Sequence, residues 1–183
     1  NFLVKNIILV LKKLHYATGV TIGRNVLRKQ LQILQRDCLV QIIREPKTSK
    51  EWEQYYYLRW QILRAPLNLA KGSEKDDLED SAIHRAIFDK EKVVGVGRLH
   101  FIDKDTAQIR YMAVLKKSRG KGLGRMLVEE FNQISKENKI FKIFLYAREH
   151  VIEFYKKLGF EIIKKAHRFE NIQHFLMERK NNY

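Results

Sequence analysis

The sequence predicts a mixed α/β fold of the α+β type, with a twisted, mostly antiparallel sheet flanked by helices. Three apolar segments between residues 82 and 115 are separated by short polar turns, which is typical of an antiparallel meander. A glycine-rich turn at 119–125 then enters a segment with the apolar period of an amphipathic helix. The next apolar segment, 140–146, is reached by a crossover, so we expect it to lie parallel to the strand before the helix.

Composition limits the class of protein without identifying a partner. The chain has 183 residues, of which 45% are hydrophobic, so one domain with a sizeable core is expected. The formal net charge of +15 fits either a lysine-rich surface or an anionic partner such as nucleic acid, a membrane surface or a phosphorylated cofactor. The single cysteine, Cys38, excludes an intrachain disulfide and favours a reducing, cytoplasmic location.

The N-terminal segment differs from the rest of the chain. Residues 1–36 contain seven Lys or Arg and no Asp or Glu, around two apolar stretches. Such a segment can be a transit peptide or a membrane-surface helix, but we favour a helical extension packed on the domain or a partner. Its longest apolar run, 7–11, is too short to span a bilayer. We therefore expect a basic N-terminal extension at 1–36 and one domain at 37–183. The first methionine is Met112, which leaves open a natural start before Asn1.

The first elements of the domain have clear boundaries. A strand is expected at 39–44, because Pro46 cannot continue a ladder. Thr48 and Glu51 have the spacing of a capping box, which predicts a helix from there to Leu63, where Ala65-Pro66 stops it. The connection 68–80 contains five acids (Glu74, Asp76, Asp77, Glu79 and Asp80). It is either a solvated loop or a lid that presents acids to a cationic substrate.

The remaining elements follow in quick succession. Strands are expected at 82–88, 93–102 and 107–115, and Gly95 and Gly97 in the second predict a bulge or a close backbone approach. A helix at 122–138 precedes the strand at 140–146, and a short helix at 149–158 ends at Gly159. Two last strands are expected at 160–166 and 172–178. The six histidines lack metal-ligand spacing, so no metal is expected.

The glycine turn at 119–125 is suited to phosphate. The first turn of a helix has unpaired N–H groups and the positive end of the helix dipole, and glycines allow the backbone to come close to a ligand. The turn is not a Walker A loop, since no Ser or Thr follows the Gly-Lys pair. The spacing of Gly120, Gly122 and Gly124 also differs from the Gly-x-Gly-x-x-Gly dinucleotide fingerprint.

The segment Arg119-Gly-Lys-Gly122-Leu-Gly124 matches Arg/Gln-x-x-Gly-x-Gly/Ala, and the chain resembles the GNAT superfamily of N-acetyltransferases, in particular its small bacterial-type members. The preceding 110–115 segment is similar to the fourth strand of that family. Phe154-Tyr155-Lys-Lys-Leu158-Gly159-Phe160 is similar to its C-terminal Leu/Phe-Tyr-x-x-x-Gly-Phe motif. The resemblance covers residues 39–179, and it implies acetyl-CoA as cofactor and a parallel strand pair at the cofactor cleft.

The resemblance also implies roles for individual residues. Tyr155 would be the general acid, since a phenol with an ordinary pKa of about 10 is protonated at neutral pH. Arg148 stands where many members have Asn facing the cofactor arm, and the ending 170–177 draws attention to His174 as a catalytic candidate. The implied cofactor-binding residues are Met112, Ala113, Val114, Arg119, Gly120, Lys121, Gly122, Leu123, Gly124, Arg125 and Arg148.

Neither the base nor the acceptor follows from the sequence. The candidates for a general base are Glu79, Asp80, His84, His100, His150 and His174, and proton transfer through water is an alternative. We expect transfer of an acetyl group to a primary amine of a small molecule or a protein lysine. A polyamine, a lysine or an aminoglycoside would fit the acidic connection.

Two other functions and the oligomeric state stay open at this stage. One is a non-catalytic, acyl-CoA-binding regulatory domain. The other is nucleic-acid binding, for which no known motif is present. No membrane span is expected, and a homodimer is left open.

Overall fold

The computed structural model describes residues 41–181, and the expectations for residues 1–36 lie outside that range. Seven strands and three helices alternate with three short 3-10 turns in these residues. The strands are β1 (Ile42–Arg44), β2 (Ile83–Asp89), β3 (Lys92–Phe101), β4 (Thr106–Val114), β5 (Lys142–Arg148), β6 (Glu161–Phe169) and β7 (Ile172–Lys180). The helices are α3 (Ser49–Leu63), α4 (Leu123–Glu137) and α5 (Ile152–Lys156), and the 3-10 turns are η1 (Ala65–Leu67), η2 (Lys116–Ser118) and η3 (Glu149–Val151).

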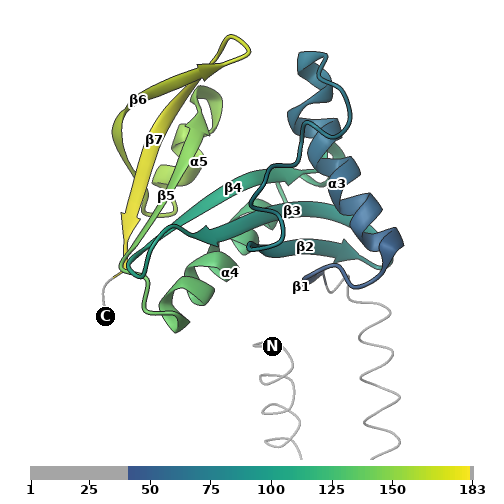
Figure 1. Cartoon of the computed structure of the whole chain (residues 1–183), viewed down its shortest axis with the longest axis horizontal. Helices are drawn as coiled ribbons and strands as arrows, with labels where there is room; N and C mark the ends of the chain where they lie inside the picture. The colour runs from purple at the N-terminus through teal and green to yellow at the C-terminus, as the bar shows by residue number, and fades with distance from the viewer. Residues whose placement is uncertain (1–40, 182–183) are drawn as a thin grey trace, which may run out of the picture. The chain divides into compact units, whose positions relative to one another are not determined.

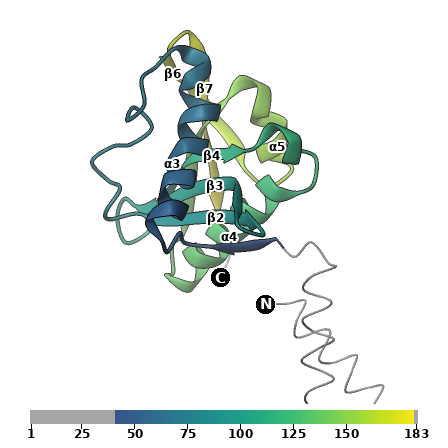
Figure 2. The same cartoon turned by 90° about the vertical axis from the view of Figure 1, so that its right-hand side faces the viewer.

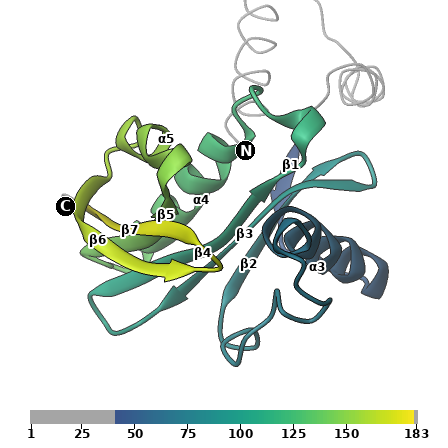
Figure 3. The same ribbon diagram turned by 90° about the horizontal axis from the view of Figure 1, so that it is seen from above.

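The strands form one sheet in the order β1-β2-β3-β4-β5-β7-β6. Every neighbouring pair is antiparallel except β4 and β5, which are parallel. The helices α3 and α4 lie on opposite faces of the β2–β3–β4 part of the sheet (Figures 2 and 3). This arrangement confirms the predicted mixed, mostly antiparallel α/β fold with one parallel pair.

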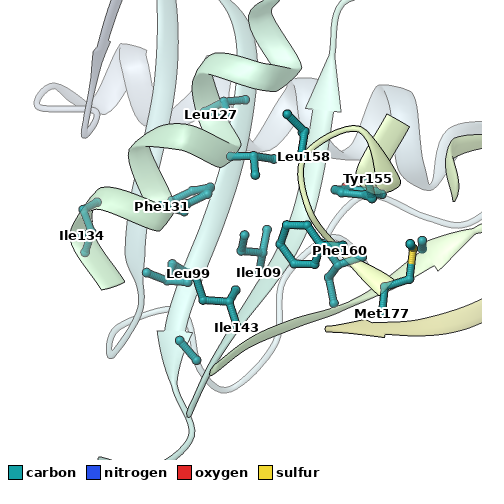
Figure 4. Packing of buried hydrophobic residues seen from close by; sticks show 14 of the residues in the cluster. Leu99, Ile109, Leu127, Phe131, Ile134, Ile143, Tyr155, Leu158, Phe160 and Met177 are labelled. Atoms are coloured by element: carbon teal, nitrogen blue, oxygen red, sulfur yellow. The ribbon is translucent and has the colours of Figure 1, made fainter. Parts of the chain in front are cut away.

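Two hydrophobic clusters hold the layers together. On one face, α4 and the α5 region pack on β3, β4, β5 and β7 (Figure 4). On the other face, Tyr55 and Leu58 of α3 pack on β2 and β3. The Tyr55 hydroxyl donates a hydrogen bond of 2.9 Å to the Gly97 carbonyl, which ties α3 to the middle of β3. Both helices are thereby fixed to β3 and β4.

A β-bulge interrupts the pairing of β3 with β4. Arg98 pairs with Arg110 and Val96 with Ala113, so Gly97 alone faces two residues, Tyr111 and Met112. Tyr111 adopts a positive φ of 53°, a conformation that non-glycine residues rarely adopt. A bulge bends the strand that carries it and increases its twist. It is the feature that Gly95 and Gly97 predict in the sequence.

The strands β4 and β5 separate soon after they begin. Their pairing is limited to Thr106–Gln108 with Lys142–Phe144. Beyond that point β5 continues to pair with β7 as far as Arg148, while β4 bends away (Figure 1). On the side that faces β5, the main chain of β4 from residue 109 onward therefore has no strand partner among residues 41–181.

The predicted elements agree with the structure in type and order, and their ends shift by a few residues. Thr48 caps α3 as the sequence predicts, since its hydroxyl accepts a hydrogen bond from the Glu51 N–H at 3.3 Å. The last predicted helix, 149–158, is divided into η3 and the five-residue α5. The strand predicted at 39–44 is β1, which begins at Ile42, and residues 39 and 40 lie outside the described range. No helix within residues 41–181 is long and apolar enough to cross a membrane.

Substitution of Gly97 tests the bulge. A Cβ at this position would lie 2.7 Å from Met112 Sδ and 2.8 Å from Phe131 Cε2. We expect Gly97→Ala to lower the free energy of unfolding by about 1–3 kcal/mol, the usual cost of overpacking a core. Urea unfolding of the variant and the wild type measures the difference.

Gly95→Ala is the matched control on the same strand. There a Cβ would meet only the side chain of Ile87, with the flexible Cδ1 nearest at 3.0 Å. The control should lose clearly less stability than Gly97→Ala. Equal losses in the two variants would contradict the special role of Gly97.

Candidate active site

A cavity of about 710 Å³ lies where β4 and β5 separate. It is lined from both faces of the sheet, by the end of α3 on one side and by the start of α4 and α5 on the other. The lining residues are Ile62–Arg64, Gln108–Val114, Arg119, Gly120, Gly122–Arg125, Leu145–Arg148, His150, Val151, Phe154, Tyr155, Lys157, His167, Phe169 and His174. The cavity therefore passes between the two strands and has two ends of different chemistry.

The glycine turn forms one end of the cavity. Gly120 and Gly122 have positive φ values of 77° and 79°, and Gly122 is the N-cap of α4. A Cβ at either position would meet no atom within 4 Å, so the space above them is open. Gly124 is required for a different reason, because a Cβ there would lie 3.0 Å from Phe154 Cζ. The turn thus presents the N–H groups of a helix start to an open part of the cavity.

The three cations of the turn differ in their surroundings. Arg119 Nε donates a hydrogen bond of 3.2 Å to the Val114 carbonyl, which joins the turn to the end of β4. Arg125 is paired with Glu129 at 3.6 Å, one turn further along α4. Lys121 is exposed, and it is the only one of the predicted site residues that does not line the cavity. The predicted turn is therefore brought to the cavity almost complete.

Tyr155 is buried beside the turn. Its ring packs against Phe154 and Phe160, with ring centroids 4.9 Å and 5.8 Å away. Burial raises the pKa of its hydroxyl above the ordinary value, which keeps the phenol protonated. No hydrogen bond joins that hydroxyl to any of the described residues, although Tyr155 lines the cavity. The hydroxyl is thus available to donate a proton to a bound molecule.

His174 lies toward the other end, on β7. Its Nδ1 is 3.0 Å from the Ile172 carbonyl oxygen. Because a carbonyl can only accept, Nδ1 carries the proton of the neutral ring and Nε2 is left as an acceptor. Burial, assisted by the nearby His167, Arg148 and Arg64, lowers the pKa of His174. The ring is therefore neutral at neutral pH and can accept a proton.

His174 is stacked on His167 of β6, with ring centroids 5.2 Å apart and an interplanar angle of 12°. The His167 ring also packs against the Tyr146 ring at an interplanar angle of 65°, with ring centroids 4.9 Å apart. In the pairing of β5 with β7, His174 lies opposite Arg148. The hairpin β6–β7 thus places an imidazole pair next to the end of β5.

Arg148 crosses the cavity toward α3. Its Nη2 donates a hydrogen bond of 3.1 Å to the Leu63 carbonyl. Burial, followed by the neighbouring Arg64, lowers the pKa of Arg148. The Arg64 guanidinium lies over the Phe169 ring, with Cζ 4.7 Å from its centroid. The predicted contact of Arg148 with a cofactor arm stays a prediction, because its guanidinium is directed toward α3.

The acidic connection 68–80 does not line the cavity. Asp76 accepts from Arg98 at 2.6 Å and Glu79 from Arg59 at 2.7 Å, and both guanidiniums are fully buried. Burial raises the pKa of each carboxyl, but the arginine hydrogen bonds outweigh it and hold both below their ordinary values. These acids neutralise arginines in the interior, as buried charges require. The hypothesis that they meet a cationic substrate is therefore wrong for Asp76 and Glu79.

The other candidates for a general base are also placed by the structure. His84 is buried between α3 and the acidic connection, with Nε2 2.7 Å from the Glu79 carbonyl oxygen. His100 is buried on β3, and Asp80 is exposed, and none of these three lines the cavity. Of the six candidates only His150 and His174 do so.

Several lining residues have no signal in the sequence. Arg64 follows a helix end, and His167 and Phe169 lie on a hairpin whose register is not readable from the chain itself. Tyr111 and Phe154 lie in the two segments that resemble family motifs, 110–115 and 154–160. Nothing in those motifs indicates that the two side chains line the cavity. Within residues 41–181, no group of three or more His, Cys, Asp or Glu side chains is arranged to hold a metal ion.

Comparison with known proteins identifies relatives of this chain by sequence. The acetyltransferase (GNAT) family model matches residues 40–160. The uncharacterised N-acetyltransferase YjcF of Bacillus subtilis (strain 168) is 25% identical over 119 residues, which cover 65% of this chain and 84% of that protein.

Solved structures agree in fold. An acetyltransferase from Streptococcus agalactiae 2603 has a TM-score of 0.65 at 24% identity, covering 77% of this chain and 98% of its own. The PaiA N-acetyltransferase from Thermoplasma acidophilum, in complex with coenzyme A, has a TM-score of 0.61 at 16% identity, covering 77% and 99%. The predicted fold and the family resemblance are both confirmed.

We expect the buried His100 to make the free energy of unfolding fall at acidic pH. Burial, followed by Arg98 and Arg110, lowers its pKa to about 4. Between the unfolded value of about 6.5 and that pKa the unfolded chain binds more protons, so stability falls as the pH falls. His84, whose pKa is also lowered by burial, acts in the same direction. We expect His100→Gln to lose less stability than the wild type between about pH 7 and pH 5, as measured by urea unfolding.

Substitution of the exposed His150 by Gln is the control for this comparison. Its loss of stability over the same pH range should equal that of the wild type. An unchanged pH dependence in His100→Gln would contradict the assignment.

Proposed function

This chain belongs to the acetyltransferase (GNAT) family, and we propose that it transfers an acetyl group from acetyl-CoA to a primary amine of a small molecule or a protein. The observation that carries the proposal is one cavity that joins an open glycine turn at a helix start to a buried, unpaired tyrosine. A non-catalytic acyl-CoA-binding domain would need the turn but not the tyrosine.

The turn fits the pyrophosphate of coenzyme A. Open space lies above Gly120 and Gly122, and the unpaired N–H groups of the α4 start face it. The exposed Arg119 and Arg125 add positive charge beside these groups. The coenzyme A bound to the PaiA relative supports this choice of cofactor. Lys121 would act only through its charge at the outer rim.

The open edge of β4 fits the extended arm of the same cofactor. The main chain of Met112–Val114 lines the cavity beyond the last pair of β4 with β5. An extended ligand can hydrogen-bond such an edge as an added strand would. Held there, acetyl-CoA would supply a thioester whose carbonyl the N–H groups of this β4 edge would polarise. Attack by the amine would then form the amide and release the thiol.

Tyr155 and His174 would move the protons. We assign Tyr155 as the general acid that protonates the departing thiolate, because burial keeps its hydroxyl protonated. We assign Nε2 of His174 as the acceptor of the amine proton, directly or through water, because the ring is held neutral with Nε2 free. A cytoplasmic location stays a prediction from the single cysteine.

Cofactor binding is tested by thermal unfolding. A ligand at about 100 times its Kd that binds only the folded state stabilises it by about 2.7 kcal/mol, which for this chain length raises Tm by roughly 5–10 °C. We expect acetyl-CoA to produce that rise in the wild type. In Gly122→Val the new side chain enters the open space above the turn, and the rise should be lost.

Gly72→Val is the matched control, because Gly72 also has a positive φ, 101°, with no atom within 4 Å of an added Cβ, but lies outside the cavity. It should keep the rise in Tm despite the same backbone strain. No rise in the wild type would refute the proposed cofactor. A normal rise in Gly122→Val would mean that the turn does not hold it.

Tyr155→Phe tests the general acid. Loss of a positioned acid lowers turnover by about 100-fold or more, whereas the cofactor should still bind because the ring remains. Thiol release from acetyl-CoA with a panel of amines gives turnover, and the acetyl-CoA shift in Tm gives binding. Tyr57→Phe, on the exposed side of α3, is the control and should keep full turnover. Unchanged turnover in Tyr155→Phe would remove this residue from the chemistry.

A further inference from the structure

The end of the cavity farther from the glycine turn is positively charged and has no acid. It is formed by Arg64 at the end of α3, Arg148 at the end of β5 and the imidazole pair His167–His174. None of the described residues that line any part of the cavity is Asp or Glu. A polyamine or an aminoglycoside would require carboxylates here, so this wall does not fit a polycation.

The two arginines lie close together and lack carboxylate partners. Arg148 Nη2 donates a hydrogen bond of 3.1 Å to the Leu63 carbonyl, and Arg64 Nε donates one of 2.9 Å to the Ser73 carbonyl. Neither forms an ion pair within residues 41–181. Arg64 is near enough to help burial lower the pKa of Arg148. Two such cations side by side repel each other unless an anion lies between or against them.

Three arginines near this pair are neutralised by carboxylates. Arg59 and Arg98 are neutralised by Glu79 and Asp76. Arg110, which also lines the cavity, is paired with Asp76 at 2.9 Å. The unpaired guanidiniums of the cavity are therefore Arg119 at the glycine turn and the Arg64–Arg148 pair at the opposite end. The first serves the phosphates of the proposed cofactor, which leaves the pair for a second anion.

One aromatic ring and one main-chain carbonyl hold Arg64 and Arg148 in place. The Phe169 ring lies under the Arg64 guanidinium, so the tip of the β6–β7 hairpin meets the end of α3 (Figure 1). Arg148 is held from the other side by its bond to Leu63, in the same segment of α3. A guanidinium that is fixed by stacking or by one hydrogen bond keeps its remaining N–H donors for a planar or tetrahedral oxyanion.

We propose that Arg64 and Arg148 bind an anionic group of the acceptor, so that the amine substrate carries a carboxylate or a phosphate. The proposal rests on the proposed function, since it names the class of acceptor for that reaction. It replaces the cationic amine that the acidic connection indicates in the sequence. It also assigns the Arg148 side chain to the acceptor and leaves the cofactor arm to the β4 main chain.

Binding of matched amine pairs tests the proposal directly. Calorimetry on the full chain with coenzyme A present compares O-phosphoethanolamine with ethanolamine, and L-leucine with L-leucinamide. A hydrogen-bonded charge pair is worth about tenfold in affinity or more, so the anionic member of at least one pair should bind about tenfold more tightly. The pair that shows the preference distinguishes phosphate from carboxylate. Equal binding within both pairs, or tighter binding of spermidine, would overturn the proposal.

Substitutions of the two arginines test whether they cause the preference for the anionic amine. Arg64→Gln and Arg148→Gln should each weaken the anionic member about tenfold while the acetyl-CoA shift in Tm stays as in the wild type. Arg148→Lys, which keeps the charge, should restore part of the affinity. Arg168→Gln is the control, because Arg168 is exposed next to His167 but does not line the cavity. An anion preference that persists in both glutamine variants would overturn the proposal.

Thiol release separates this proposal from the proposed function. If amines release thiol from acetyl-CoA without any preference for the anionic members, the acceptor class is wrong and the acetyl transfer stands. If the anionic probes bind through Arg64 and Arg148 while no amine releases thiol, the anion site stands and the acetyl transfer fails.

Discussion

The parallel strands β4 and β5 are held together only over Thr106–Gln108, and the separation that follows organises the molecule. It depends on the bulge at Tyr111, where β4 bends away, and on Gly97, which leaves room for Met112 and Phe131. If β4 and β5 stayed paired along their whole length, hydrogen bonds between them would close the space that the cavity occupies. Because these strands separate, a cavity passes between the two faces of the sheet and β4 keeps an open main-chain edge.

Acidic and basic side chains are distributed unequally between the connection 68–80 and the cavity. Two acids of the connection after α3, Asp76 and Glu79, neutralise the fully buried Arg59 and Arg98 inside the fold. The cavity itself has arginines and histidines but no carboxylate among its described lining residues. The net charge of +15 is thus not only a surface property, because part of it is concentrated where an anion would bind.

Much of the fold and one half of the site could be predicted from the sequence, because they depend on neighbours along the chain. Glycines 120, 122 and 124 are read from spacing alone, and the structure explains them by positive φ or by close contact with Phe154. Thr48 caps α3 because its partner is only three residues away. The meander β2–β3–β4 and the parallel placement of β5 follow from loop lengths and the crossover, whereas the position of β7 between β5 and β6 was not predicted. Tyr155 is predicted by its motif and found buried in the same cavity.

The acceptor half was decided by the tertiary structure. Arg64 and Phe169 are more than a hundred positions apart, and they meet only because the β6–β7 hairpin reaches the end of α3. His167 and His174 stack because of one strand register, which a shift by one residue would reverse. Asp76 and Glu79 of the connection 68–80 are assigned to interior arginines by contacts that no local pattern reveals. The sequence by itself therefore determined the glycine turn that is proposed to hold a phosphate-bearing cofactor, because that turn depends on local backbone conformation. Only the packing of distant segments decided the charge that an acceptor would meet.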